Sequence, residues 1–92
     1  MMEDVETRRK RLKIRAWRRG IKEMDLLIGG YADTHLATMS VADLDEFELL
    51  MDEHDQDLLA FATGQREVPT AIAPMLEKLI AAADHSKWAT KG

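Results

Sequence analysis

Apolar residues recur every three to four positions through most of the chain, which is the spacing of one buried helix face. The clearest run of this kind consists of Trp17, Ile21, Met24, Leu27 and Ile28. No stretch of the sequence shows the strict alternation of apolar and polar residues that a half-buried strand requires. The pattern therefore predicts an all-α fold, a compact bundle of four to five short helices.

The N-terminal half is predicted to contain two helical stretches. The first begins near Asp4 or Val5, and the second runs from about residue 17 to residue 28. These stretches are either one helix or two helices with a bend near residues 18–20, and the pattern leaves both interpretations open. The glycine pair at 29–30 is predicted to end the second stretch, because glycine is common just after the last turn of a helix.

Three further helices are predicted in the C-terminal half. Ser40 is a typical N-cap residue, and an apolar helical stripe follows it. Asp55 is predicted to cap a short helix that Gly64 ends. The last helix is predicted to start around Thr70, with Pro74 tolerated in its first turn.

Length and composition indicate one globular domain. The 92 residues, 46% hydrophobic and 33% charged, predict a single helical domain over 1–92, with 1–7 and 86–92 as frayed tails. No apolar run is long enough to span a bilayer, so no membrane partner is expected. The N-terminus has neither the apolar core of a secretory signal nor the acid-poor composition of a transit peptide. We therefore expect a bacterial cytoplasmic protein, or the mature form of a mitochondrial matrix protein.

Charge is distributed unevenly along the chain. Residues 1–22 carry nine Lys/Arg and three Asp/Glu, a net charge of +6, whereas residues 23–92 have a net charge of −10. Such a basic segment can bind nucleic acid by neutralising phosphates. The cations that could do so are Arg8, Arg9, Lys10, Arg11, Lys13 and Arg15. The alternative is that the basic first helix docks on its own acidic domain or is a solvated face. The overall acidic charge and the lack of a recognisable reading helix favour this second interpretation.

Residue types that carry catalysis or metal binding are sparse. His35, His54 and His85 are not spaced as a helical pair of metal ligands, and no glycine-rich phosphate loop occurs. The chain has no cysteine, so it can have no thiol nucleophile. We therefore predict no catalytic residue, no metal site and no tightly bound cofactor, and we expect that the protein is not an enzyme.

One segment stands out because a glycine interrupts an otherwise helical pattern. On a helix, Arg19 and Glu23 would be neighbours one turn apart, at the edge of a flat strip made by Ala16 and Gly20. A glycine within a helix costs about 1 kcal/mol relative to alanine, which suggests that another molecule must approach the backbone closely there. The alternative is that Gly20 marks a bend between two helices. The residue pattern alone favours neither.

The sequence Arg19-Gly20-x-x-Glu23 resembles the RGxxE motif of the SdhE-type FAD assembly factors, also called succinate dehydrogenase assembly factor 2. The context is similar as well, because Trp17 precedes a doubled arginine and Asp25 follows two places after the glutamate. The resemblance extends from about residue 15 to residue 79 and includes the helix layout of residues 40–61.

The resemblance implies a small all-helical protein that binds the flavoprotein subunit of succinate dehydrogenase, and in bacteria that of fumarate reductase. It implies that the factor promotes covalent attachment of FAD to a histidine of that subunit, which attacks the 8α-methyl carbon of the flavin. FAD is then the cofactor of the partner flavoprotein, and the factor supplies no nucleophile. The residues implied to contact the partner are Arg18, Arg19, Gly20, Glu23 and Asp25.

Overall fold

The computed structural model describes residues 3–83, and in this range it contains helices and connecting loops only. The elements are α1 (Val5–Ala16), α2 (Lys22–Met24), η1 (Asp25–Gly29), α3 (Gly30–His35), η2 (Leu36–Thr38), α4 (Val41–Met51), α5 (Asp55–Ala62) and α6 (Ala73–Ala82). The elements α2, η1 and α3 follow one another without a break and form one helix. The predicted all-α bundle of four to five short helices is therefore confirmed.

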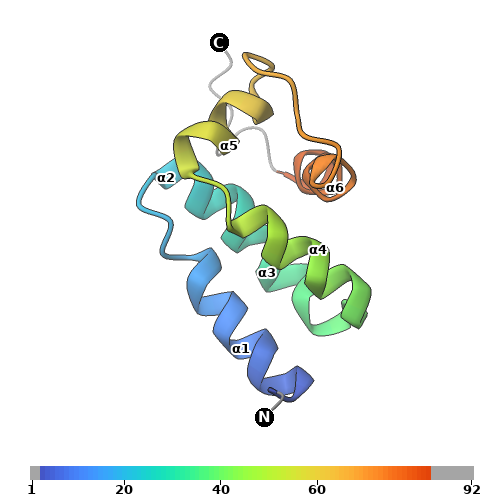
Figure 1. Cartoon of the computed structure of the whole chain (residues 1–92). Helices are drawn as coiled ribbons and strands as arrows, with labels where there is room; N and C mark the ends of the chain where they lie inside the picture. The colour runs from blue at the N-terminus through green and yellow to red at the C-terminus, as the bar shows by residue number, and fades with distance from the viewer. Residues whose placement is uncertain (1–2, 84–92) are drawn as a thin grey trace.

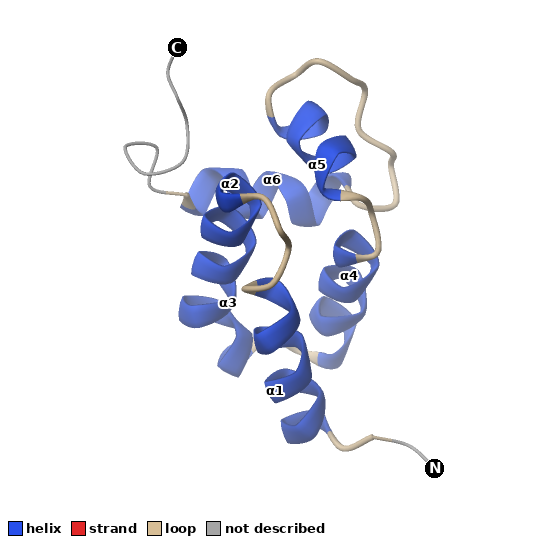
Figure 2. Ribbon diagram, turned by 90° about the vertical axis from the view of Figure 1, so that its left-hand side faces the viewer, coloured by secondary structure: helices blue, strands red, loops and turns tan. Residues whose placement is uncertain are grey.

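Three helices lie side by side, and a further helix crosses them. α1 lies beside α3 and α4 with its axis roughly aligned with theirs, and α3 runs antiparallel to the other two (Figures 1 and 2). α6 packs against α4 and η1, and it crosses these helices near the end where α5 lies (Figure 2). No helix in residues 3–83 is both long enough and apolar enough to span a membrane.

The hydrophobic core is built by all of these helices. Leu12 of α1, Ile28 of η1, Phe47 of α4, Leu58 of α5 and Leu79 of α6 are each 0% exposed. No polar or charged residue of the described part is fully buried. Packing of apolar stripes is therefore the main source of stability in this small bundle.

α1 begins at Val5, inside the segment 1–7 that was predicted as a tail. Its start is fixed because Oδ1 of Asp4 accepts a hydrogen bond from the backbone N–H of Thr7 at 2.7 Å. The other predicted tail, 86–92, lies outside the described residues.

The prediction that the glycine pair at 29–30 ends a helix was wrong. The helix continues through it, with a π-helical turn at Asp25–Gly29 that accommodates one extra residue. A Cβ atom on Gly29 would lie 2.5 Å from Cδ2 of Trp17, so this glycine allows the indole ring to pack on the helix backbone. The ring is also held by a hydrogen bond of 3.0 Å from Nε1 of Trp17 to Oδ1 of Asp33.

Two predicted helix caps are confirmed. Oγ of Ser40 accepts a hydrogen bond from the N–H of Asp43 at 3.1 Å, at the start of α4. Gly64 has a φ of +80° just after α5, and the N–H of Gln65 donates to the carbonyl of Ala60 at 2.8 Å. These are the features of a glycine-terminated helix end.

The predicted cap of α5 was wrong. α5 begins at Asp55 itself and is preceded by His54, whose side chain makes no capping hydrogen bond. The Asp55 carboxylate is bound by Arg19 instead. The last helix, α6, starts at Ala73, three residues later than predicted, and has Pro74 in its first turn as expected.

Candidate functional site

The segment that carries the Arg-Gly motif is a loop rather than a helix. α1 ends at Ala16 and α2 begins at Lys22, so residues 17–21 connect two helices. Gly20 has a φ of +97°, a left-handed conformation that costs other residues about 1–2 kcal/mol. The bend interpretation is therefore correct. The predicted flat helical strip was wrong, because Gly20 is outside the helices and Ala16 is 0% exposed.

The side chain of Arg19 turns inward and is 8% exposed. Its Nε donates to Oδ1 of Asp55 at 2.7 Å. Its two terminal nitrogens donate to the backbone carbonyls of Met51, at 2.6 Å, and Glu53, at 2.7 Å. The guanidinium thus connects the C-terminal end of α4, where positive charge is favoured by the helix dipole, with the first residue of α5.

The backbone of the loop is held as well. The N–H of Arg19 donates to Oδ1 of Asp25, the first residue of η1, at 2.8 Å. Trp17 fixes the start of the loop through its packing on Gly29. Residues 17–21 are therefore tied to the body of the protein at their start and in the middle.

The remaining predicted contact residues lie on the surface. Arg18 and Gly20 are exposed, and Glu23, in the first turn of α2, is half-buried. Within residues 3–83, neither the Arg18 nor the Glu23 side chain forms an ion pair or hydrogen bond. Of the five predicted contact residues, Arg19 and Asp25 hold the loop, whereas Arg18, Gly20 and Glu23 remain accessible.

A shallow hollow of about 500 Å³ lies between this loop and the start of α5. It is lined by Arg19, Gly20 and Ile21 and by residues 54–57. The contribution of α5 to this hollow is not predictable from the residue pattern, because 36 residues separate Arg19 from Asp55. No local signal in a single sequence joins positions so far apart.

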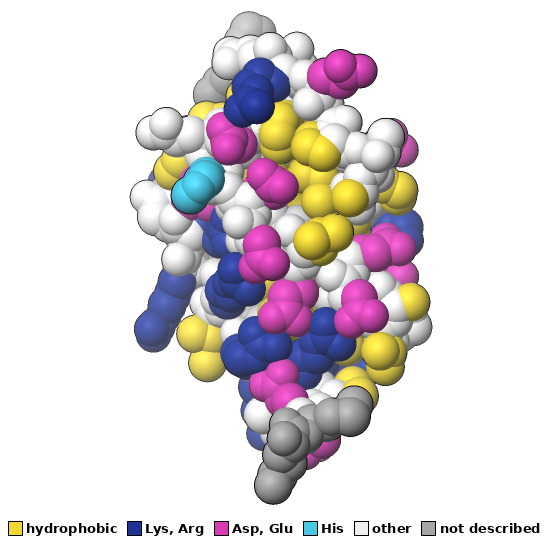
Figure 3. Space-filling view, in the orientation of Figure 1, with side chains coloured by type: hydrophobic (Ala, Val, Ile, Leu, Met, Phe, Trp, Pro, Cys, Tyr) yellow, Lys and Arg dark blue, Asp and Glu magenta, His cyan; other side chains and the backbone are white. Residues whose placement is uncertain are grey.

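Four of the six basic side chains of α1 pair with acids of the same chain. Arg8 contacts Asp45 at 2.7 Å and Glu48 at 2.9 Å, both on α4. Arg11 contacts Glu48 at 2.9 Å, and Arg15 contacts Asp52 at 2.8 Å. Basic and acidic side chains accordingly lie side by side over the lower half of the view in Figure 3.

These ion pairs change the pKa of Glu48. Hydrogen bonds from Arg11, and then from Arg8, lower the pKa of the Glu48 carboxyl below its usual value, against an opposing effect of burial. The interpretation that the basic first helix docks on its own acidic domain is therefore confirmed. Binding of nucleic acid through Arg8 and Arg11 would require that these ion pairs first break.

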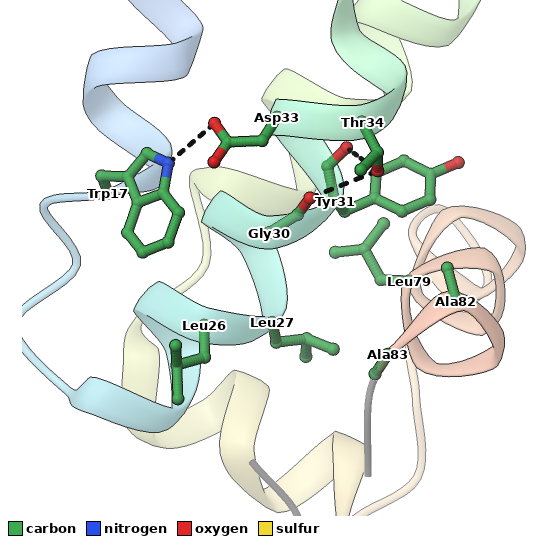
Figure 4. Close-up of a pocket in the computed structure, with 10 residues that line it drawn as sticks. All are labelled: Trp17, Leu26, Leu27, Gly30, Tyr31, Asp33, Thr34, Leu79, Ala82 and Ala83. Carbon is green, nitrogen blue, oxygen red and sulfur yellow. Dashed lines mark hydrogen bonds between the residues drawn. The ribbon is translucent and has the colours of Figure 1, made fainter. Parts of the chain in front are cut away.

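A second hollow, of about 380 Å³, is mainly apolar. Leu27 of η1 and Leu79 of α6 approach it from two helices, and Trp17 lies at one side (Figure 4). Trp17 is 39% exposed. No cluster of His, Asp and Glu in the part of the chain that is described could hold a metal ion.

The site lies within a region that matches a known family. A family model described as flavinator of succinate dehydrogenase matches residues 10–83. The match includes loop 17–21, the residues of α4 and α5 that bind Arg19, and the helix that follows Gly20.

Curated relatives agree with this match. The chain is 38% identical over 82 residues to "Succinate dehydrogenase assembly factor 2, mitochondrial" of Yarrowia lipolytica, covering 84% of this chain and 57% of the relative. It is 41% identical over 66 residues to the protein of the same name from Meyerozyma guilliermondii, covering 72% and 49%. It is 34% identical over 79 residues to "FAD assembly factor SdhE" of Acetobacter pasteurianus, covering 85% and 72%.

The chain spans about half the length of the two yeast relatives and 72% of the bacterial one. The family match covers every helix from α2 to α6 completely and the C-terminal part of α1, so it concerns the whole bundle rather than a single motif. The Arg-Gly loop, the helices that hold it and this match lead to one conclusion: the chain belongs to the family of flavinators of succinate dehydrogenase.

Proposed function

We propose that this protein is an assembly factor that binds the flavoprotein subunit of succinate dehydrogenase and promotes covalent attachment of FAD to it. The flavoprotein subunit of fumarate reductase is proposed as a second client. The observation that carries the proposal is the family match over residues 10–83, which contains the whole Arg-Gly loop in its folded context. The names of the relatives from Yarrowia lipolytica and Acetobacter pasteurianus support it.

The proposed role of the chain is to hold the partner in a reactive geometry. Gly20 offers exposed backbone in a fixed conformation, so a partner backbone can approach it closely. Arg18 and Glu23 offer charges that can pair with groups of opposite sign on the partner. Holding two reacting groups in the right orientation can by itself lower a barrier by several kcal/mol.

The reacting groups themselves are proposed to belong to the partner. The histidine that attacks the flavin is on the flavoprotein subunit, and FAD is bound there. The chain is therefore proposed to bind no FAD tightly and to act as a binding protein rather than as an enzyme. The polar hollow beside Gly20, shallow and formed by a loop and one helix start, suits contact with a protein surface.

The proposed location is the bacterial cytoplasm, or the mitochondrial matrix if the chain is a mature eukaryotic form. The two yeast relatives are named mitochondrial. The Acetobacter pasteurianus relative is a bacterial FAD assembly factor.

The test is the variant Glu23→Ala in cells that lack the endogenous factor. We expect the bundle to stay folded, because Glu23 makes no ion pair within residues 3–83, and we expect the gain in covalent flavin to be lost. Covalent flavin is measured as fluorescence of the flavoprotein subunit in a denaturing gel. Glu46→Ala is the matched control, because Glu46 is also half-buried, on a helix and without an ion pair in the described part.

Normal flavin attachment with Glu23→Ala would contradict the assignment of this surface. Equal losses with Glu23→Ala and Glu46→Ala would also contradict it, because Glu46 lies on α4, outside loop 17–21 and α2.

A further inference from the structure

The side chain of Arg19 is largely buried. Its side chain is 8% exposed, whereas its neighbour Arg18 is exposed. Nε and both terminal nitrogens of Arg19 already donate hydrogen bonds within the chain. A guanidinium in this state is poorly placed to pair with a charge on another protein.

Moving Arg19 towards a partner would also leave other groups without their donors. The Asp55 side chain is 14% exposed and would lose its cationic partner. The carbonyl of Glu53 would lose the donor at 2.7 Å. Leaving a largely buried charge without its partner is strongly unfavourable, so Arg19 is expected to stay in place when the partner binds.

Asp55 lies where it can fix the position of both Arg19 and Gly20. Its Oδ1 binds Arg19, while its Oδ2 lies 3.8 Å from the position that a Cβ atom on Gly20 would occupy. The same carboxylate therefore binds Arg19 and lies next to the face of Gly20 where a side chain would project. It fixes the loop against the first turn of α5, which forms the opposite wall of the hollow.

The charges of the hollow are largely compensated. Asp55 pairs with Arg19, and Asp57 pairs with Arg66 at 2.7 Å. The groups left to a partner are the backbone of Gly20 and the exposed side chains of His54 and Gln56. Such a surface is suited to hydrogen bonds with a polar loop rather than to pairing with a strongly charged segment.

We propose that Arg19 and Asp55 are a positioning pair that makes no contact with the partner. The pair holds loop 17–21 against α5, and the partner's polar loop docks in the hollow that results. The proposal rests on the proposed function, since it describes how the same surface receives the flavoprotein subunit. It adds residues 54–56, at the start of α5, to the docking surface.

The experiment measures the affinity of the full chain for the flavoprotein subunit before flavin attachment. The variants are Arg19→Ala, Asp55→Ala and the double variant, with circular dichroism to establish that each is folded. Asp52→Ala is the matched control. Asp52, at the C-terminal end of α4, also pairs with an arginine, Arg15 of α1, but it lies outside the hollow. Asp55→Asn tests rescue, because its amide oxygen can still accept the hydrogen bond from Nε of Arg19.

We expect Arg19→Ala and Asp55→Ala each to weaken binding about tenfold or more, and the double variant to bind no worse than either single variant. Asp52→Ala should bind within about twofold of the wild type, as expected for an exposed pair. Asp55→Asn should recover most of the affinity. Hydrogen exchange should quicken at the amides of residues 18–22 in Asp55→Ala while the amides of α1 stay protected. A loss of overall stability would not produce that local change.

Wild-type affinity in Asp55→Ala together with lost affinity in Arg19→Ala would overturn the inference, because Arg19 would then contact the partner itself. Multiplied losses in the double variant would overturn it too, since the two residues would act independently. A wild-type chain that fails to bind the flavoprotein subunit would overturn the proposed function, and that result is distinct from either of these.

Discussion

Arg19 and Arg11 both bind carboxylates of their own chain, but Arg19 is 8% exposed and Arg11 is 42% exposed. Arg11 belongs to a row of surface pairs between α1 and α4, in which Glu48 also binds Arg8. Arg19 belongs to no such row, and it donates hydrogen bonds to two backbone carbonyls in addition to Asp55. Water can replace Arg11 at its acids, but it cannot easily reach the partners of Arg19. The basic residues of the N-terminal segment therefore have two roles. Those of α1 form exposed ion pairs, whereas Arg19 fixes the conformation of loop 17–21.

The largest expected effect is that of Arg19→Ala on stability. We expect the free energy of unfolding to fall by about 2–4 kcal/mol, because a largely buried carboxylate and two carbonyls lose their donor. Arg11→Ala should cost less than about 1 kcal/mol. Urea denaturation of the two variants measures both values. Equal losses of unfolding free energy in the two variants would contradict the distinction between the buried arginine of the loop and the exposed arginine of α1.

The next effect concerns the Trp17 end of the loop. Gly29→Ala should lower stability by about 1–3 kcal/mol, because its Cβ would collide with the indole ring and force the ring to move. Gly30→Ala is the matched control: its Cβ would meet no atom within 4 Å. That substitution should raise stability by up to about 1 kcal/mol, as alanine is the better helix former. Tryptophan fluorescence in a Trp88→Phe background follows the ring, and an unchanged spectrum in Gly29→Ala would contradict the packing.

A smaller effect is expected at Gly20. Space is available there, since the nearest atom to an added Cβ is 3.8 Å away, so the cost of Gly20→Ala comes from its φ of +97° alone. That cost should be about 1–2 kcal/mol, and Gly20→Asn should cost less, because asparagine tolerates left-handed conformations. Thermal unfolding ranks the two variants. If alanine is no worse than asparagine, the loop conformation is not under the constraint described.

The smallest effect belongs to the surface pairs of α1 and α4 and depends on pH. The pKa of Glu48 is lower in the folded than in the unfolded protein, so its stabilisation is complete above the unfolded value of about 4.5 and is lost as pH falls through the folded value. Glu48→Gln should therefore cost under about 1 kcal/mol at neutral pH. The difference from the wild type should shrink between pH 5 and pH 3 (approximate limits) and in high salt. Urea denaturation across this range tests the prediction, and a difference independent of pH would contradict it.

Features with a local signal could be predicted from the sequence. Ser40 and Gly64 are recognisable caps because the hydrogen bonds they make or permit lie within a few residues. The apolar stripe of α4 was predictable for the same reason, since helical spacing alone decides which side chains share a face. The charge imbalance between the two parts of the chain favoured either docking of α1 on its own acidic domain or a solvated basic face, and the fold shows the docking.

Features that depend on distant contacts could not be predicted in this way. Gly29 resembles a helix stop, because helix ends and close packing both require glycine, and only the position of Trp17 distinguishes them. Asp55 resembles an N-cap, since the sequence does not reveal that Arg19 competes for its carboxylate. The RGxxE resemblance identified the family and the segment, but the separation of holding residues from accessible ones required the fold.

The π-helical turn at Asp25–Gly29 has a consequence for how related chains should be aligned. A π-helical turn takes up one extra residue while the helix on either side keeps its direction, so a chain with one residue fewer here would regain a regular helix and still present Glu23 in nearly the same direction relative to Tyr31. A chain with the same number of residues but a regular helix would instead rotate Glu23 by about 100°. A single gap between these two positions is therefore compatible with the same surface, whereas an equal count without the π-helical turn is not.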